Sequence, residues 1–228
     1  MERILVTGAA GFIGFHTATY LLRRGAHVVG IDNMDGYYDV SLKEARRDLL
    51  SNESNFVFQL FDIENQEGLV DIFKKHRFDR VIHLAAQTGV RYSTVNPDSY
   101  IRSNLVGFAN ILECCQQGNT KHLTFASTSS VYGANTELPS STDQRTDRPV
   151  SLYAATKKAN ELLAHSYSHL YGLPITALRF FRFMARGDGL IWPYTLLVKR
   201  FSQENRLTCT IMVKCEGILH TLTTLLRA

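Results

Sequence analysis

The sequence predicts an α/β fold built on a doubly wound parallel sheet, and three observations lead to this fold class. A short apolar run, residues 3–7, ends directly at a glycine-rich turn. Short apolar segments then alternate with longer amphipathic segments as far as residue 181, the order expected of strands and crossover helices. Near the end of this pattern, Tyr153 and Lys157 are spaced to share one face of a helix.

The glycine-rich turn joins the first predicted strand to a helical pattern at residues 15–24. Its glycines let the backbone approach a pyrophosphate, whose charge then lies at the amino terminus of the helix. The order of strand, turn and helix is Rossmann-like, and the alternative is a glycine turn that serves only packing. The predicted cofactor contacts in the turn are Gly8, Gly11, Phe12, Ile13 and Gly14.

A second predicted strand, residues 26–31, ends in Asp32 at about the distance from the glycines expected of a ribose-binding acid. We expect Asp32 to hold the adenosine ribose hydroxyls. Its charge would repel a 2′-phosphate, and Asn33 and Met34 offer no Arg to bind one. The expected cofactor is therefore NAD rather than NADP.

Two further strands, residues 56–61 and 81–86, continue the alternation. Asp62 follows the first of them and is placed either to meet the adenine or to cap the next helix. The second strand ends in small residues, which would let the cofactor lie close to the sheet. The predicted contacts of these two strand ends are Asp62, Ile63, Ala85 and Ala86.

A long predicted helix, residues 97–117, precedes a fifth strand at residues 121–127. A second long helix is expected at residues 152–171, followed by a sixth strand at residues 174–181. Ligands of open α/β sheets bind at the carboxyl edge of the strands. The fifth strand therefore brings three candidate polar contacts to that edge, which are Thr128, Ser129 and Ser130.

Tyr153 and Lys157 lie at the start of the second long helix, four residues apart. A free phenol has a pKa of about 10 and is a poor base at neutral pH. A neighbouring ammonium and a nicotinamide cation would both favour the phenolate and lower that pKa into the range useful for acid–base catalysis. The pair therefore predicts a proton-transfer site, and the alternative is an ordinary surface helix that carries Tyr and Lys.

Three motifs give the sequence a resemblance to the extended short-chain dehydrogenase/reductase family, the NAD-dependent epimerases and dehydratases. They are Gly8-x-x-Gly11-x-x-Gly14, the stretch at residues 127–133, and Tyr153-x-x-x-Lys157. Four longer stretches resemble, more narrowly, the UDP-glucuronate 4-epimerases of bacterial surface-polysaccharide synthesis. These stretches are residues 39–43, 86–93, 103–107 and 151–157, and the resemblance extends over residues 1–181.

The resemblance implies an NAD-dependent isomerase that converts UDP-glucuronate to UDP-galacturonate through a 4-keto sugar. Tyr153 would take the proton from the sugar 4-hydroxyl while hydride leaves C4 for NAD⁺, and Lys157 would bind the nicotinamide ribose. Thr128 would hydrogen-bond the reacting oxygen. Ser129 and Ser130 would face the sugar or its carboxylate.

Other readings of the same residues stay open. Arg91 is the nearest candidate cation for the substrate, although a structural ion pair is an equal alternative. Dehydratases of the family have Asp-Glu directly after the Thr, where this chain has Ser129 and Ser130. The alternative functions are a UDP-glucose/galactose 4-epimerase and a non-catalytic NAD-binding module. The family often forms homodimers through the helices expected here at residues 97–117 and 151–171.

The resemblance stops inside a motif, directly after Phe181. The family continues Thr-Val-Tyr-Gly-Pro-Trp-Gly-Arg-Pro-Asp-Met-Ala, whereas residues 182–193 read Arg-Phe-Met-Ala-Arg-Gly-Asp-Gly-Leu-Ile-Trp-Pro. Codons compatible with this segment spell the family motif when each codon is started one base earlier. The same offset applied to residues 207–224 gives a second segment that resembles the family.

This offset predicts a frameshift that divides the chain in two. Residues 1–181 are expected to form the NAD-binding Rossmann domain with the catalytic Tyr and Lys. Residues 182–228 are expected to be an out-of-frame tail with no domain of their own, so that the C-terminal substrate domain is largely missing. We then expect an exposed edge on the sixth strand and little or no enzymatic turnover.

Composition agrees with this boundary. The 228 residues include 25 Lys and Arg against 21 Asp and Glu, a formal net charge of +4. Residues 1–181 hold 18 of each sign, and residues 182–228 hold 7 against 3, so the excess lies wholly in the tail. The basic balance is therefore no argument for nucleic acid or a membrane as a partner. With no signal peptide or long apolar run, the chain is expected to be cytoplasmic.

The remaining cysteines and histidines favour structural roles. Cys114 and Cys115 lie in a helical pattern and are expected to be buried or half-buried thiols, not a disulfide. His165 and His169 lie one helical turn apart without Glu or Cys in register, so we expect helix surface and no metal site. His83 lies within an apolar strand and is expected to be a hydrogen-bonded core histidine.

Overall fold

The computed structural model describes residues 1–135, 139–181, 196–201 and 208–209. These residues form one eight-stranded sheet with the order β3-β2-β1-β4-β5-β6-β7-β8. The six strands from β1 to β6 are mutually parallel, which confirms the predicted doubly wound, Rossmann-like fold. Their bounds are β1 Arg3–Thr7, β2 His27–Asp32, β3 Phe56–Leu60, β4 Arg80–His83, β5 His122–Thr128 and β6 Ile175–Phe180.

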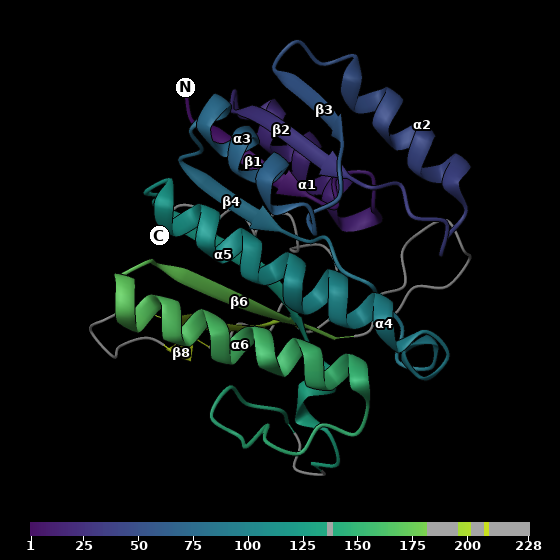
Figure 1. Cartoon of the computed structure of the whole chain (residues 1–228), viewed down its shortest axis with the longest axis vertical. Coiled ribbons are helices and arrows are strands. Elements are labelled where there is room, and N and C mark those ends of the chain that lie inside the picture. Colours follow the sequence, from purple (N-terminus) through teal and green to yellow (C-terminus); the bar gives the residue numbers. More distant parts are fainter. Residues whose placement is uncertain (136–138, 182–195, 202–207, 210–228) are drawn as a thin grey trace.

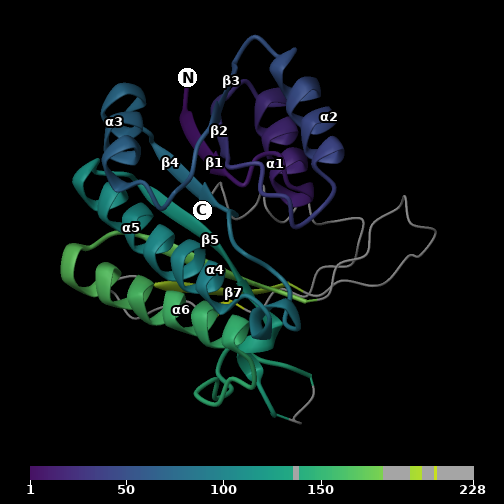
Figure 2. The same ribbon diagram turned by 45° about the vertical axis from the view of Figure 1, so that its right-hand side comes forward.

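Helices cover both faces of the sheet (Figures 1 and 2). Two of them lie on one face, and the others lie side by side on the opposite face, where α6 neighbours α5 and α5 neighbours α3. The first face carries α1 Phe12–Arg23 and α2 Val40–Ser51, and the second carries α3 Gln66–His76, α4 Pro97–Tyr100, α5 Gly107–Gln117 and α6 Leu152–Tyr171.

The alternation of side chains along the central strands divides the core between these two faces. In β1, Ile4 and Val6 pack into the cluster under α1, whereas Leu5 packs into the larger cluster under α3, α5 and α6. All three side chains are buried. Strands buried on both faces read as continuous apolar runs, which explains why the sequence pattern identified them.

The fourth strand is shorter than predicted. It ends at His83, so Ala85 and Ala86 follow the strand and do not belong to it. The Thr7 hydroxyl accepts the backbone N–H groups of Leu84 and Ala85, at 3.1 and 3.0 Å. The Leu84 N–H also donates to the Thr7 carbonyl at 3.2 Å, so Thr7 binds the first residues after β4 through both its backbone and its side chain.

The predicted helix at residues 97–117 is present, but it is not a regular α-helix. A π-helical segment, η2 Ile101–Val106, lies between α4 and α5. Such segments are rare and occur mostly at functional positions. The predicted helix at residues 152–171 is confirmed, since α6 begins after Ser151, whose hydroxyl accepts the Ala154 N–H, and ends at Gly172 with φ +68°.

The prediction of an uncovered edge on the sixth strand is wrong. The strand β7 Leu196–Phe201 pairs with β6 in antiparallel register, and β8 Thr208–Cys209 pairs in turn with β7. An edge strand presents unpaired N–H and C=O groups to any segment that can extend beside it. An antiparallel neighbour needs no crossover helix. The remaining residues of the predicted out-of-frame tail lie outside the described residues.

Candidate cofactor and catalytic site

The glycine turn after β1 has the close backbone packing that the sequence predicted. Gly8 has φ +69°, and its N–H donates to the Ile31 carbonyl at 2.8 Å. The Gly11 N–H donates to the Gly8 carbonyl at 3.0 Å. A Cβ atom added to Gly14 would lie 2.0 Å from that carbonyl oxygen, so only glycine fits at this position. The turn therefore brings the start of α1 directly against the end of β1.

The amino terminus of α1 is suited to an anion. Gly11 is the N-cap residue and supplies no side-chain hydrogen bond to the first turn. The first-turn N–H groups of Phe12, Ile13 and Gly14 are therefore donors without a side-chain cap, at the positive end of the helix dipole. This arrangement fits the pyrophosphate of a dinucleotide. Phe12 is 38% exposed, so its ring borders the same region.

Asp32 lies at the end of β2 beside this turn, and it is buried. Its Oδ2 accepts the Ala10 N–H at 3.1 Å, and its Oδ1 accepts the Met34 N–H at 2.9 Å. Lys43 of α2 forms an ion pair with Oδ1 at 3.4 Å. This cation was not predicted, because Lys43 reaches Asp32 from α2 and not from the residues that directly follow β2.

The predicted adenine-side residues have separate surroundings. Asp62 accepts hydrogen bonds from the Asn33 side chain at 3.1 Å and from the Glu64 N–H at 3.0 Å. It does not cap the next helix, since Asn65 is the N-cap residue of α3. The Ile63 side chain is buried in the core, and its carbonyl accepts a hydrogen bond from Asn110, so only its N–H remains for a ligand.

Ala85 and Ala86 are half-buried beside the glycine turn. A Cβ atom on Gly8 would lie 2.8 Å from the Ala85 nitrogen, so the loop after β4 packs directly on the turn. The structure therefore brings together at one sheet edge the predicted contacts from β1, β2 and β4. These are the donor groups and small side chains that a bound dinucleotide requires.

The catalytic candidates meet at the end of β5. Thr128 is the last residue of that strand, and its side chain lies close enough to the Tyr153 phenol to favour the phenolate. Lys157 is buried one helical turn further along α6, and its Nζ donates to the Ala126 carbonyl at 3.0 Å. The two residues that the sequence placed on one helix face therefore both contact the carboxyl end of β5.

Opposing effects act on the pKa of the Tyr153 phenol. Burial raises this pKa above its ordinary value of 10, and the nearby Thr128 side chain opposes the rise. The Lys157 ammonium donates to the Ala126 carbonyl, so the lowering expected from Lys157 and a nicotinamide cation stays a prediction for the chain with bound cofactor. Burial also lowers the pKa of Lys157 to about 8.

The predicted substrate residues lie near Thr128 and differ in exposure. Ser129 and Ser130 are half-buried in η3 Ser129–Tyr132, a single 3₁₀ turn that Thr128 caps by accepting the Ser130 N–H at 3.2 Å. Arg91 is exposed before η1 Tyr92–Thr94. Among the described residues Arg91 makes no ion pair, so the structural alternative for this residue finds no support there.

Sequence analysis missed a tyrosine cluster beside Tyr153. The Tyr100 ring meets Tyr153 edge-on, with ring centroids 6.1 Å apart, and its hydroxyl donates to the Gly89 carbonyl at 2.6 Å. Burial and neighbouring tyrosines raise the pKa of Tyr100 to about 12. Tyr37 and Tyr92 pack on the same side, 4.7 Å apart. These rings are contributed by three separate segments, which no local pattern in the sequence connects.

Asn104 is a second residue that sequence analysis did not assign. It is buried in the π-helical segment η2, where its Oδ1 accepts the Gln87 N–H at 2.9 Å. Its Nδ2 donates to the Gln87 carbonyl at 3.0 Å and to the Thr156 hydroxyl at 3.1 Å. Asn104 therefore ties the loop after β4 to the helix that carries Tyr153. The π-helical segment η2 is the structural feature that points to Asn104. The spacing of apolar residues in the sequence does not reveal this segment.

The predicted burial of His83, Cys114 and Cys115 and the predicted exposure of His165 and His169 are confirmed. The Thr7 hydroxyl accepts two backbone N–H groups and so donates its own hydrogen to His83 Nδ1 at 2.9 Å. Burial lowers the pKa of His83 to about 3, with a smaller effect of Lys157. Cys114 and Cys115 are buried free thiols. His165 and His169 are exposed on α6.

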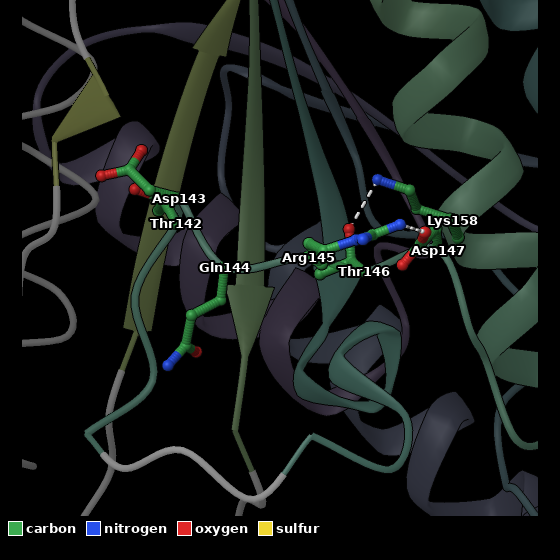
Figure 3. A pocket seen from close by; sticks show the side chains of 7 residues that line it. All are labelled: Thr142, Asp143, Gln144, Arg145, Thr146, Asp147 and Lys158. Atoms are coloured by element: carbon green, nitrogen blue, oxygen red, sulfur yellow. Dashed lines mark hydrogen bonds and ion pairs between the residues drawn. The ribbon is translucent and has the colours of Figure 1, made fainter.

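A separate polar hollow lies beside α6 (Figure 3). Arg145 pairs with Asp147 at 2.6 Å, and Lys158 donates to the Thr146 hydroxyl at 2.6 Å. Lys158 also pairs with Glu161 outside the hollow, and no observation points to a ligand here. Its lining residues are Thr142, Asp143, Gln144, Arg145, Thr146, Asp147 and Lys158.

Two further features concern the described residues as a set. No helix in the described ranges is both long enough and apolar enough to cross a membrane. In the same part of the chain, no three His, Cys, Asp or Glu side chains gather where they could hold a metal ion.

Relatives of this chain are found along most of its length. A family model described as GDP-mannose 4,6 dehydratase matches residues 5–189. Protein CapI of Staphylococcus aureus is 55% identical over 179 residues, which are 78% of this chain and 53% of that protein. UDP-glucuronate 4-epimerase 4 of Arabidopsis thaliana is 54% identical over 179 residues, which are 78% of this chain and 41% of that protein. The chain thus spans about half the length of the curated relatives it matches.

Solved structures have the same fold. A UDP-glucuronic acid 4-epimerase from Bacillus cereus, in complex with UDP-glucuronic acid and NAD, matches with a TM-score of 0.73 and 38% identity, over 78% of this chain and 56% of that one. A UDP-glucose 4-epimerase from Thermotoga maritima with UDP-glucose matches with a TM-score of 0.66 and 32% identity, over 78% and 55%. Since the family model covers most of the chain and these similarities agree with it, the chain belongs to the NAD-dependent epimerase/dehydratase family that the GDP-mannose 4,6 dehydratase model describes.

Proposed function

We propose that this chain carries the cofactor-binding and acid–base part of an NAD-dependent UDP-sugar 4-epimerase, with UDP-glucuronate as the substrate and UDP-galacturonate as the product. The observation that carries the proposal is the meeting of Tyr153, Lys157 and Thr128 at the end of β5, on the sheet edge that holds the glycine turn. The relatives named as UDP-glucuronate 4-epimerases support it.

The cofactor residues fit a dinucleotide. The uncapped N–H groups at the start of α1 would hold the pyrophosphate, and Asp32 with Lys43 would hold the adenosine ribose. Bound NAD⁺ would accept the hydride from C4 of the sugar and, as NADH, would give it back to the other face of the ketone, and its positive charge would lie near the phenol. Lys157 would turn from the Ala126 carbonyl toward the nicotinamide ribose.

Tyr153 is the acid–base group in this proposal. As phenolate it takes the proton of the sugar 4-hydroxyl, and it returns that proton after the ketone has turned over. The nearby Thr128 side chain stabilises the phenolate, and so opposes the effect of burial. A charged Lys157 beside the ring would add to this stabilisation, since a pKa near 8 leaves it mostly protonated at neutral pH.

The choice of substrate rests on the residues after Thr128. Ser129 and Ser130 supply hydroxyls without a carboxylate, which suits an epimerase and leaves no second acid–base pair for the elimination of water by a dehydratase. Exposed Arg91 supplies a cation for the sugar carboxylate or the diphosphate. UDP-glucose is the alternative substrate, supported by the similarity to the Thermotoga maritima enzyme.

We also propose that residues 182–228 are a frameshifted tail and that this product turns over sugar weakly. The pairwise similarities extend over 179 residues, although the family model extends to residue 189. The tail would replace the part of the protein that clamps the UDP-sugar. Resequencing the gene across the Phe181 codon tests this, and an unbroken frame that encodes the same tail contradicts it.

The proposal extends to cytoplasmic polysaccharide synthesis and to a homodimer through α5 and α6, which lie side by side (Figure 1). Large apolar side chains are exposed on α6, including Leu162 at 59% and Leu170 at 67%. Such surfaces on neighbouring helices are typical of protein interfaces. Light scattering of the purified chain tests the dimer, and a monomer at all concentrations contradicts it.

The test of the function is a chromatographic assay of UDP-glucuronate with NAD⁺. We expect slow or undetectable formation of UDP-galacturonate by the 228-residue chain, and efficient formation by a version with the frame restored at Phe181. Tyr153→Phe in the restored version should abolish it. A restored version that leaves the C4 configuration unchanged overturns the proposed function, and efficient turnover by the 228-residue chain overturns the proposed weakness.

A further inference from the structure

A carboxylate and a guanidinium are buried together behind the catalytic edge. Arg179 of β6 is fully buried, and Glu161 of α6 is 2% exposed. The pair is bidentate, because Arg179 Nε donates to Glu161 Oε1 at 2.8 Å and Nη2 donates to Oε2 at 2.7 Å. Lys158 lies 3.6 Å from the same Oε2. The acid–base proposal assigns no role to this pair.

The pair is directly connected to the strand end that carries Thr128. The Ser127 hydroxyl donates to Glu161 Oε1 at 2.7 Å, and Ser127 is the register partner of Arg179 on the neighbouring strand. Arg179 Nη1 also donates to the Tyr132 hydroxyl at 3.0 Å. Tyr132 is the last residue of η3. The buried pair thus joins α6, β5, β6 and the 3₁₀ turn that follows Thr128.

Three successive turns of α6 hold the end of β5. Tyr153, Lys157 and Glu161 are four residues apart and so lie on one helix face. The first lies near Thr128, the second donates to the Ala126 carbonyl, and the third accepts from Ser127. Of these three helix residues, Glu161 also forms an ion pair with Arg179, which belongs to a third element, β6. It is therefore the anchor that fixes helix and strand relative to one another.

Stability alone is a poor explanation for a buried ion pair. Removing two charges from water costs several kcal/mol per ion, and apolar replacements are often equally stable. Here the pair fixes the distance between α6 and the end of β5, the two segments that carry Tyr153 and Thr128. A shift of 1 Å between such groups is enough to weaken a hydrogen bond strongly.

We propose that Glu161 is a positioning residue for the acid–base pair: held by Arg179, it anchors Ser127 and thereby sets the distance between Thr128 and Tyr153. This proposal rests on the proposed function, because Tyr153 is an acid–base group only in that function. The positioning of Tyr153 relative to Thr128 can be tested on the chain alone. The consequence is that loss of the Ser127 anchor lets Thr128 move away from Tyr153, which removes its support of the phenolate and favours the neutral phenol.

The experiment follows the Tyr153 phenol by NMR. The 228-residue chain is labelled with ¹³C-tyrosine, the Tyr153 signal is assigned with Tyr153→Phe, and the signal is titrated against pH. Ser127→Ala removes one hydroxyl and leaves the ion pair intact, and we expect it to raise the pKa of Tyr153 by about half a pH unit. Glu161→Gln should shift it further in the same direction wherever the chain stays folded.

Ser168→Ala is the matched control. Ser168 is buried on the same helix, two turns beyond Glu161, and within the described ranges its hydroxyl has no hydrogen-bond partner. It should leave the Tyr153 titration unchanged, whereas a general effect of buried hydroxyls would shift it as Ser127→Ala does. An unshifted Tyr153 in folded Ser127→Ala, or an equal shift in Ser168→Ala, overturns the positioning role. Because the titration contains neither sugar nor cofactor, its result is independent of the turnover assay.

Discussion

The glycine turn after β1 and the end of β5 lie on the same sheet edge but are held in place by different interactions. At the glycine turn, backbone meets backbone, and a single methyl on Gly14 would collide with the Gly8 carbonyl at 2.0 Å. At the end of β5, buried charged side chains hold the geometry, with Glu161 and Arg179 in a bidentate pair. The first region depends on residues close in sequence, and the second on residues from three separate elements.

This difference teaches how each region fails. A backbone-built turn tolerates no added atom, because there is no side chain that can move aside. A site built from buried charges tolerates changes of shape better than the loss of one partner, because the remaining ion is left without compensation. The predictions below break each region in its own way and then test the residues that connect them.

The largest effect is expected from Arg179→Ala. Glu161 would remain buried without its partner, and such uncompensated charges cost about 3–5 kcal/mol of unfolding free energy. Urea unfolding followed by circular dichroism measures it. Arg102→Ala is the control, since Arg102 is 62% exposed in its pair with Glu64 and such pairs contribute about 1 kcal/mol or less. Equal losses in the two variants would contradict this view of the catalytic region.

Gly14→Ala tests the backbone region. The added methyl forces the turn and α1 apart, at a cost of about 1–3 kcal/mol or more, and the displaced N–H groups should lose most of their affinity for NAD⁺. Denaturant unfolding and calorimetric titration with NAD⁺ measure the two effects. Gly36→Ala should change neither, because a Cβ atom at Gly36 meets nothing within 4 Å. Full NAD⁺ affinity in Gly14→Ala would refute the role of the turn.

His83 connects the two regions, since it accepts from Thr7 and lies near Lys157. Burial lowers its pKa from 6.5 to about 3, so between these values the unfolded chain binds a proton that the folded chain does not. Its stabilising effect is complete above pH 6.5 and is lost as the pH falls toward 3, at up to about 1.4 kcal/mol per pH unit. Stability measured from pH 7 to 4 should fall less steeply for His83→Asn, and identical slopes would exclude the effect.

The smallest effect is expected at the start of α6. Ser151 caps the helix that carries Tyr153, and Ser151→Ala should cost about 1 kcal/mol in thermal or chemical unfolding. The change removes one hydrogen bond and no buried charge. Ser166→Ala, at an exposed position within the same helix, should cost nothing measurable. If the two variants unfold alike, the cap does not fix the position of Tyr153.

The sequence predicted those features that short-range patterns determine. The strands β1 to β6, the glycine turn and the bounds of α6 follow from apolar runs, glycine spacing and a capping Ser. The early end of β4 was not predictable from local patterns. The Leu84 and Ala85 N–H groups after this strand donate to the Thr7 hydroxyl, which lies far away in the sequence. The π-helical segment around Asn104 was also not predictable, since Asn104 contacts Gln87 and Thr156, which lie far from it in the sequence.

The candidate site divides in the same way. Tyr153, Lys157 and Thr128 were found because their chemistry and spacing are visible in the chain. The effect of burial, which raises the pKa of Tyr153, was not predicted, because burial cannot be read from a helix period. Lys43, Glu161 and Arg179 are ordinary charged residues in the sequence, and only the folded chain brings them to their partners.

The central claim is that the edge formed by the glycine turn and the Tyr153 helix binds an oxidised dinucleotide. Calorimetric titration of the purified 228-residue chain with NAD⁺ and, separately, with NADP⁺ tests it most directly. We predict one NAD⁺ bound per chain and at least roughly tenfold weaker binding of NADP⁺, because the buried Asp32 carboxylate, although paired with Lys43, is placed to accept the ribose hydroxyl that the extra phosphate would replace. Absence of NAD⁺ binding by the folded chain would contradict the account.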